Sequence, residues 1–194
     1  MSENMDYNEQ DGQKNQSYDI KFINPVLIIN AIGIEEGSIV ADFGCGSGYF
    51  SLPIAKKIGE NGVLYALDIL PQSIEMINGY AKTMGLTNII TKRVNLEKNN
   101  GSTLNEGSCD WVIMKDMLFQ NKLKGNIIKE AARVLREGGK ILIIEWDTKD
   151  SSIGPNCSVR IPKESLMEII QESGMSILNE IPVSNFHYGL VLVK

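Results

Sequence analysis

The stretch that decides the fold is Val40-Ala41-Asp42-Phe43-Gly44-Cys45-Gly46-Ser47-Gly48-Tyr49, in which glycines alternate where an apolar strand ends and a helix begins. Glycine lets the backbone approach a ligand closely, and the N-terminus of the following helix offers free N–H groups. We therefore expect a nucleotide-like cofactor at this loop. The third glycine of the dinucleotide fingerprint GxGxxG would fall at Tyr49, and no lysine follows the last glycine as in a P-loop, so both phosphate-binding patterns are disfavoured.

Outward from this loop, short apolar runs alternate with segments of helical period. The predicted strands cover 39–41, 63–67, 88–94, 111–114 and 141–144, and the predicted helices cover 22–33, 50–58, 73–84, 121–136 and 163–173. Pro71 and Pro162 are expected at first helical positions, and Gly138-Gly139 is expected to end the fourth of these helices. This alternation predicts a doubly wound α/β domain with a mostly parallel sheet.

The C-terminal region departs from that alternation. Two further strands, 176–181 and 188–193, are joined by a link too short for a crossover helix. Such a short connection requires the two strands to run antiparallel to each other. The sheet is therefore expected to finish with an antiparallel C-terminal strand.

Length and composition limit the remaining possibilities. The chain has 194 residues, 43% of them hydrophobic, which predicts one domain over 21–194 preceded by a polar, flexible leader over 1–20. A net charge of −5 disfavours nucleic acid as a partner. We find no apolar stretch long enough for a membrane span and no secretory signal. Three cysteines without CxxC spacing predict neither a disulfide framework nor a zinc site, and a cytoplasmic location is expected.

Polar side chains follow two further strands at the edge where the glycine loop lies. Asp68 follows the second predicted strand, and its carboxylate can accept two hydrogen bonds from a ribose diol, while Ile69 can cover one face of an adenine. Asn95 and Leu96 follow the third, and the amide of Asn95 can both donate to and accept from an adenine edge. Three successive strand ends are thus expected to converge on a nucleoside.

These residues resemble a known family. Asp42 to Gly48 resembles motif I, DxGxGxG, of the Rossmann-like S-adenosylmethionine-dependent methyltransferases, and Asp68 resembles that family's ribose-binding acidic residue. The segment 140–147, KILIIEWD, is similar to the fifth strand of small prokaryotic members akin to the quinone-biosynthesis and arsenite methyltransferases. The resemblance covers residue 20 to the C-terminus and implies a seven-stranded sheet whose last strand is antiparallel.

The resemblance also implies S-adenosylmethionine as the cofactor, S-adenosylhomocysteine as the product and a set of binding residues. Many members carry Asp where this chain has Asn95. The residues implied to bind the cofactor are Asp42, Gly44, Cys45, Gly46, Gly48, Asp68, Ile69, Asn95, Leu96 and Lys115.

The methyl acceptor is expected to be a small molecule, bound at the carboxyl edge of the sheet. Methyl transfer is an in-line displacement, so positioning supplies most of the catalysis and a general base is needed only for a neutral acceptor of high pKa. His187 begins the antiparallel strand at that edge and is a candidate base, although a lone histidine there can also be a packing residue. The candidate acceptor-pocket residues are Asp116, Trp146, Arg160, His187 and Tyr188.

Several alternatives remain open at this stage. Arg160 can pair with an anionic acceptor or be an ordinary surface arginine, and Asp116 and Asp147 can be Mg²⁺ ligands or solvated loop carboxylates. We predict no metal. Of the cysteines, only Cys157 is expected to face the acceptor, so arsenic methylation is disfavoured.

Two rival functions are a catalytically silent S-adenosylmethionine- or nucleoside-binding module and an NAD-dependent oxidoreductase. The segment 114–120 lacks the [DNS]PP[YFW] pattern of amino-group methyltransferases acting on adenine or glutamine. The leader and the loop 151–160 are expected to order over the ligand.

Overall fold

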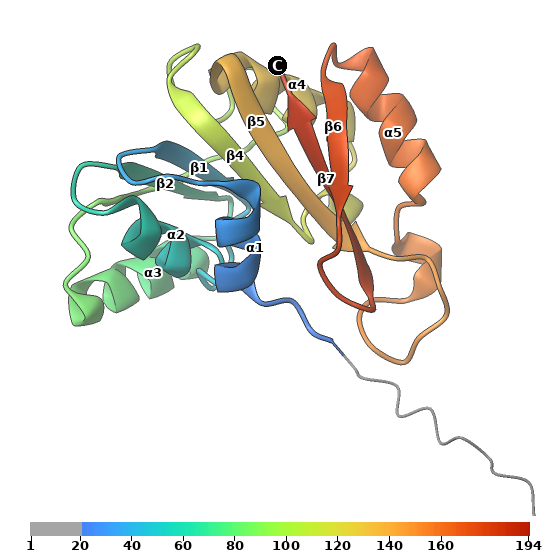
Figure 1. Ribbon diagram of the computed structural model, residues 1–194, viewed down its shortest axis with the longest axis horizontal. Coiled ribbons are helices and arrows are strands. Elements are labelled where there is room, and N and C mark those ends of the chain that lie inside the picture. Colours follow the sequence, from blue (N-terminus) through green and yellow to red (C-terminus); the bar gives the residue numbers. More distant parts are fainter. Residues whose placement is uncertain (1–20) are drawn as a thin grey trace, which may run out of the picture.

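A seven-stranded sheet organises the chain in the computed structural model, which describes residues 21–194 (Figure 1). The strand order is β3-β2-β1-β4-β5-β7-β6, and β7 runs antiparallel to both of its neighbours while the other strands share one direction. The predicted doubly wound sheet with an antiparallel C-terminal strand is confirmed; the predicted leader lies outside the described residues. The strands are β1 (Ile39–Phe43), β2 (Val63–Asp68), β3 (Ile89–Arg93), β4 (Cys109–Lys115), β5 (Leu135–Trp146), β6 (Ser176–Ile181) and β7 (His187–Val193).

Helices cover both faces of the sheet. In Figure 1, α1 (Pro25–Ile32), α2 (Ser51–Ile58) and α3 (Pro71–Met84) lie on one face, and α4 (Lys124–Val134) and α5 (Lys163–Glu172) lie on the other. Each face has its own buried apolar cluster, because every central strand presents apolar side chains in both directions. None of the helices in residues 21–194 is long and apolar enough to cross a membrane.

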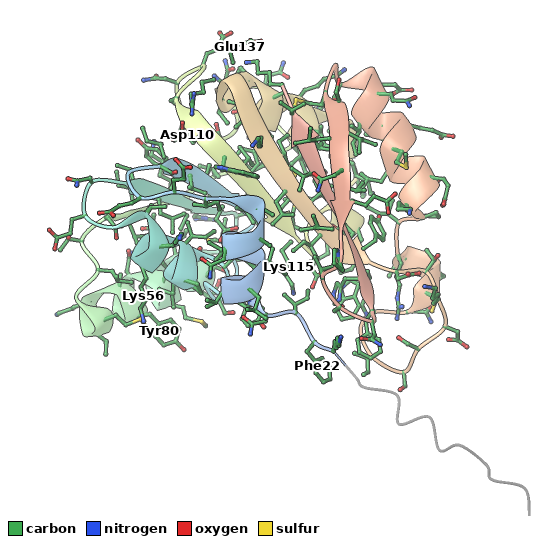
Figure 2. The ribbon with its side chains drawn as sticks, viewed as in Figure 1. Phe22, Lys56, Tyr80, Asp110, Lys115 and Glu137 are labelled. Atoms are coloured by element: carbon green, nitrogen blue, oxygen red, sulfur yellow. The ribbon has the colours of Figure 1, made fainter. Side chains whose placement is uncertain are left out.

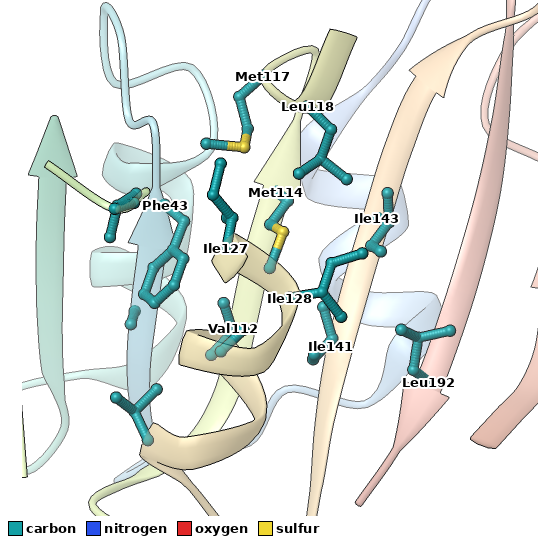
Figure 3. Packing of buried hydrophobic residues seen from close by; sticks show 14 of the residues in the cluster. Phe43, Val112, Met114, Met117, Leu118, Ile127, Ile128, Ile141, Ile143 and Leu192 are labelled. Atoms are coloured by element: carbon teal, nitrogen blue, oxygen red, sulfur yellow. The ribbon is translucent and has the colours of Figure 1, made fainter. Parts of the chain in front are cut away.

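The cluster under α4 holds the central strands at a fixed distance from that helix. Ile127 and Ile128 on α4 are fully buried against residues of β1, β4 and β5 (Figure 3). Phe43 and Met114, near the ends of β1 and β4, belong to the same cluster. The carboxyl ends of these two strands are therefore fixed by core packing, and the segments that follow them start from rigid positions.

Local signals in the sequence explain where the first helix begins and ends. The side chain of Asn24 accepts hydrogen bonds from the N–H groups of Val26 and Leu27, which caps α1. Gly33 ends the helix in the left-handed conformation, with φ 77°. The predicted helix over 22–33 is thus shorter at its start. Pro71 begins α3 as predicted, whereas Pro162 is the N-cap of α5 and not its first helical residue.

The largest departure from the predicted elements is at the junction of α4 and β5. The predicted helix over 121–136 ends at Val134, and Leu135 is already extended and paired with Cys109. Gly138, with φ 71°, lies inside β5 and does not end a helix. The pairing of β4 with β5 shifts register between Cys109 and Trp111, which accommodates the early start of β5.

The parallel strands all end at one edge of the sheet, the lower edge in Figure 1. Because β7 runs the other way, it begins at that edge, with His187 opposite Trp146. The segments that follow β1, β2, β3 and β4 and the start of β7 therefore surround the same region.

Candidate functional site

A cavity of about 480 Å³ opens at this edge of the sheet. Residues that follow β1, β2, β3 and β4 line it, so the predicted convergence of strand ends is present in the structure. The lining includes nine of the ten residues predicted to bind the cofactor: Asp42, Gly44, Cys45, Gly46, Asp68, Ile69, Asn95, Leu96 and Lys115.

Gly48, the tenth, does not line this cavity. Its φ is 84°, and a Cβ there would lie 3.2 Å from Ile77 and 3.3 Å from Leu52. The structure therefore gives Gly48 a packing role between α2 and α3 and not a place in the lining of this cavity.

Gly44 joins the glycine loop to the segment after β4. Its φ is 72°, and a Cβ there would lie 3.0 Å from the Cβ of Met117. The absence of a side chain at position 44 therefore lets the two loops lie in direct contact.

Most backbone amides of the glycine loop are occupied within the protein. The N–H groups of Gly44 and Cys45 donate to the carbonyl of Leu67 at 2.8 and 3.0 Å, and the N–H of Gly46 donates to Asp68 Oδ2 at 2.9 Å. These three amides do not form a phosphate-binding cradle. The free N–H groups were expected at the N-terminus of the following helix and not in the loop itself, and the occupied loop amides agree with the absence of a phosphate motif.

Asp68 connects the loop after β1 to the loop before α3. Its Oδ2 accepts the hydrogen bond from Gly46 and its Oδ1 accepts one from the N–H of Leu70 at 2.9 Å. The residue is only 8% exposed, yet it lines the cavity. A carboxylate offers about four acceptor positions, so two hydrogen bonds to the backbone leave room for a diol.

Asp42 is the other buried carboxyl of the cavity. Burial raises its pKa to about 6, against the opposing effect of the Ser51 hydroxyl, which donates to Asp42 Oδ2 at 2.5 Å. Burial also raises the pKa of the neighbouring Cys45 thiol. Cys45 therefore stays a neutral thiol at physiological pH.

The segment after β3 forms the far end of the cavity. Asn95 Oδ1 accepts a hydrogen bond from the N–H of Glu97 at 3.0 Å, which fixes the side chain and leaves its NH₂ group as a donor. Leu96 is 7% exposed and Ile69 is 54% exposed, and both line the cavity. An amide donor in a cavity that is also lined by apolar side chains suits a planar, weakly polar ring.

The end of β4 brings two charged residues, Lys115 and Asp116, to the cavity, and Figure 2 labels Lys115 near the lower end of that strand. Lys115 forms an ion pair with Asp116, and its Nζ lies 5.7 Å from the centre of the Tyr49 ring. Asp116 has a positive φ of 52°, a conformation that is uncommon outside glycine but that aspartate adopts more readily than most residues. Sequence reasoning missed Tyr49 as a site residue, since it was considered only as the residue replacing a glycine.

His187 lies behind Asp116 and does not line the cavity. Its Nδ1 lies 2.8 Å from the hydroxyl oxygen of Ser184, its Nε2 lies 3.2 Å from Asp116 Oδ1, and its ring lies 4.0 Å from that of Trp146. The side chain is only 7% exposed. This position corrects the prediction of direct proton transfer to His187, because Asp116 separates the imidazole from the cavity.

Arg160, predicted to pair with an anionic acceptor, is buried and holds the loop that follows β5. Its guanidinium donates to four backbone carbonyls of that loop, at 2.8 to 3.1 Å, and stacks over Trp146 with 5.6 Å between the guanidinium carbon and the ring centre. Its donors are therefore used within the protein. The four carbonyls belong to Asp147, Lys149, Ile153 and Pro155.

Trp146 and Tyr188 are likewise absent from the cavity lining. The loop backbone lies against the Trp146 ring at Gly154, where a Cβ would come within 2.5 Å of the ring. The Tyr188 hydroxyl donates to the carbonyl of Ile161 at 2.9 Å. Of the five residues predicted to form the acceptor pocket, the structure places only Asp116 in the cavity.

Replacing Arg160 with lysine should loosen the loop 147–160. A lysine has three donors on a point charge and cannot reach four carbonyls at once, so buried acceptors lose their partners. We expect the free energy of unfolding to fall by roughly 1–3 kcal/mol, with faster proteolytic cleavage inside the loop. As a matched control, Arg136→Lys at a pair whose arginine side chain is 62% exposed should change stability by less than about 0.5 kcal/mol. Equal effects of the two substitutions would contradict this role for Arg160.

Metal ligands do not cluster in the described part of the chain. Residues 21–194 contain no group of three His, Cys, Asp or Glu side chains placed to hold a metal ion. Asp147 instead pairs with Lys149 at 3.2 Å and is absent from the cavity lining.

Comparison with known proteins agrees with this geometry. A family model described as a methyltransferase domain matches residues 34–178. The chain is 32% identical over 63 residues to a protein-L-isoaspartate O-methyltransferase of Methanococcus aeolicus, covering 32% of this chain and 29% of that protein. It is 24% identical over 115 residues to an arsenite methyltransferase of Aquipseudomonas alcaligenes, covering 57% and 33%. The chain thus spans only about a third of these two relatives.

Other matches extend over more of the chain. A probable cobalt-precorrin-6B C(15)-methyltransferase of Saccharolobus solfataricus is 24% identical over 155 residues, covering 77% of this chain and 74% of that one. The crystal structure of an S-adenosylmethionine-dependent methyltransferase from Aquifex aeolicus has a TM-score of 0.82 at 20% identity, covering 89% of this chain and 90% of that one. At that identity the structural match establishes the fold.

Proposed function

Because the chain belongs to the methyltransferase domain family, we propose that it transfers the methyl group of S-adenosylmethionine to a small-molecule acceptor and releases S-adenosylhomocysteine. One observation carries the proposal. The ends of β1, β2 and β3 bring the glycine loop, the Asp68 carboxylate and the Asn95 amide to a single cavity. This is the arrangement that an adenosyl group with an amino-acid arm requires.

The residues present fit this cofactor. A cavity of about 480 Å³ is within the range of roughly 300–1,000 Å³ typical of small-molecule sites. Asp68 would accept from the ribose hydroxyls, Ile69 and Leu96 would enclose the adenine, and Asn95 would contact its polar edge. The occupied amides of Gly44, Cys45 and Gly46 favour this cofactor over a dinucleotide, whose pyrophosphate needs free N–H groups.

The cofactor would supply an electrophilic methyl group, and the protein would supply position and a water-poor surrounding. Asp42 and Lys115 lie at the rigid ends of β1 and β4 and would offer opposite charges to the ammonium and carboxylate groups of the methionyl part. Proximity and alignment are sufficient for most of the rate enhancement of a displacement reaction.

The positions of the three cysteines argue against one class of methyl acceptor. Methylation of arsenite through converging thiolates receives no support, because Cys45 and Cys109 are buried and burial raises the pKa of both thiols, that of Cys109 to about 11. Cys157 is the third cysteine and lies away from the cavity lining. We therefore propose that the methyl acceptor is an organic small molecule. The single-domain organisation and the cytoplasmic location are predictions from the sequence.

Calorimetry tests the proposal against both rivals. S-adenosylmethionine should bind with a stoichiometry of one, while NAD should show no saturable heat; tight NAD binding would favour the oxidoreductase. Formation of S-adenosylhomocysteine in the presence of a pool of small metabolites separates an enzyme from a silent binding module. Binding without turnover over the whole pool would favour the silent module.

A further inference from the structure

An ammonium group already lies in the cavity, and it belongs to Lys115. Its Nζ pairs with the Asp116 carboxylate and lies 5.7 Å from the centre of the Tyr49 ring. A carboxylate and an aromatic face are the two groups that bind an ammonium ion best in proteins. All three residues line the cavity, and the Lys115 side chain is 27% exposed, so its amino group can leave this position.

The Asp116 carboxylate is held from behind by buried polar groups. His187 Nε2 lies 3.2 Å from Asp116 Oδ1, a distance that permits ion pairing, but the two atoms are not aligned for a hydrogen bond. Ser184 Oγ accepts from the N–H of Phe186 at 3.0 Å and lies 2.8 Å from His187 Nδ1, which fixes the orientation of the imidazole ring beside Asp116. The imidazole thus positions the carboxylate and does not itself reach the cavity.

Unpartnered buried atoms concentrate at this point of the structure. Asp116 Oδ1, Glu145 Oε2 and His187 Nε2 are buried without a hydrogen-bond partner within residues 21–194. Glu145 is fully buried, its Oε1 accepts from the N–H of Leu118 at 2.7 Å, and burial raises its pKa to about 7. Buried polar groups are nearly always satisfied in folded proteins, so these three atoms make the surroundings of the Asp116 carboxylate polar rather than apolar.

We propose that Asp116 and the Tyr49 ring form a cation subsite for the methyl acceptor, which is a small amine, and that the Lys115 ammonium marks the position of the acceptor nitrogen. This inference rests on the proposed function. The charges around the cavity agree with it: its lining carries the carboxylates of Asp42, Asp68, Glu97 and Asp116 but a single cationic side chain, that of Lys115. Such a lining attracts a cation and repels an anionic acceptor.

The subsite also contains a carboxylate that can accept the proton that an amine must lose. A small amine enters as an ammonium ion, which has no lone pair and cannot act as a nucleophile. Transfer of one N–H proton to the Asp116 carboxylate breaks the N–H bond, forms an O–H bond and leaves the electron pair on nitrogen. In this arrangement Asp116 contacts the acceptor and is the catalytic residue, while His187 and Ser184 are positioning residues.

The single histidine of the chain gives a readout that is independent of turnover. Untagged protein saturated with S-adenosylhomocysteine is titrated with butylamine, and in parallel with 1-butanol as a neutral probe, while the imidazole resonance of His187 is followed by NMR. Butylamine should shift this resonance saturably and butanol should not. Asp116→Asn and Tyr49→Leu should each weaken butylamine binding by about tenfold or more, Tyr49→Phe should retain it, and Asp147→Asn is the matched control.

Calorimetry with S-adenosylhomocysteine on each variant keeps the two proposals distinguishable. Equal effects of butylamine and butanol, no response to butylamine, or unchanged butylamine affinity in Asp116→Asn would overturn the amine subsite while the proposed function stands. Failure of S-adenosylhomocysteine to bind the wild-type protein would overturn the proposed function, and the subsite with it.

Discussion

Replacing Asp68 with alanine should weaken the binding of S-adenosylmethionine by roughly 1–3 kcal/mol, which is about 5- to 150-fold in Kd. The substitution would remove the carboxylate that accepts charge-assisted hydrogen bonds from the ribose hydroxyls of the proposed cofactor. The glycine loop and the loop before α3 also lose a common anchor, because Asp68 accepts from the N–H groups of both Gly46 and Leu70. Isothermal titration calorimetry measures the change directly.

A second substitution at the same position separates these two contributions. Asp68→Asn keeps one oxygen acceptor and the shape of the side chain, so it should lose less affinity than alanine while lacking the charge. Glu75→Gln, on α3 and absent from the cavity lining, is the control and should bind as the wild type does. Unchanged affinity in Asp68→Ala would remove the ribose-binding role from this residue.

Replacing Asp42 with asparagine should make the protein more stable at neutral pH while weakening its binding of the cofactor. The folded chain holds the pKa of Asp42 at about 6, above the reference value of 3.8, mainly because the carboxyl is buried. A difference of about two pKa units corresponds to roughly 3 kcal/mol of destabilisation when the group is ionised. Asparagine removes the charge and keeps an oxygen for the Ser51 hydroxyl.

The stabilising effect of Asp42→Asn should increase with pH. Below pH 3.8 the carboxyl is protonated in the folded and unfolded chains, and the group contributes nothing. As the pH rises from 3.8 to about 6 the folded state progressively loses stability, and above that range the loss is complete. The stabilisation by Asp42→Asn, measured by urea denaturation, should therefore be greater at pH 8 than at pH 5. A stabilisation that is the same at both pH values would contradict a buried, ionised Asp42.

The sequence was sufficient to predict the sheet and the convergence of three strand ends on one cavity. Glycines at alternate positions, Asp68 at the second strand end and the short link before the last strand are local signals. Each of them depends on residues within a few positions of one another. The predicted end of the helix before β5 was wrong because Leu135 pairs with Cys109, a residue far away in the chain, instead of continuing the helix. Helical period alone contains no information about such a partner.

The acceptor side was predicted poorly for a related reason. Placing His187 at the carboxyl edge was a correct inference from topology, since β7 begins opposite Trp146. Topology does not say whether a side chain at that edge reaches the cavity, and here Asp116 stands in front of the imidazole. Arg160 has four carbonyl partners that follow from the path of one irregular loop, and no sequence pattern encodes that path.

The close approach of Gly44 to Met117 has a consequence for how the proposed preference for a methyl acceptor could change. A Cβ at Gly44 would lie 3.0 Å from the Cβ of Met117, so the segment after β4 has little space to move closer to the glycine loop. A mutation that pushes this segment toward the glycine loop would therefore also displace the proposed cofactor-binding loop. We expect selection for new acceptors in this scaffold to change cofactor affinity in the same step, and compensating changes to appear along the line of contact between these loops.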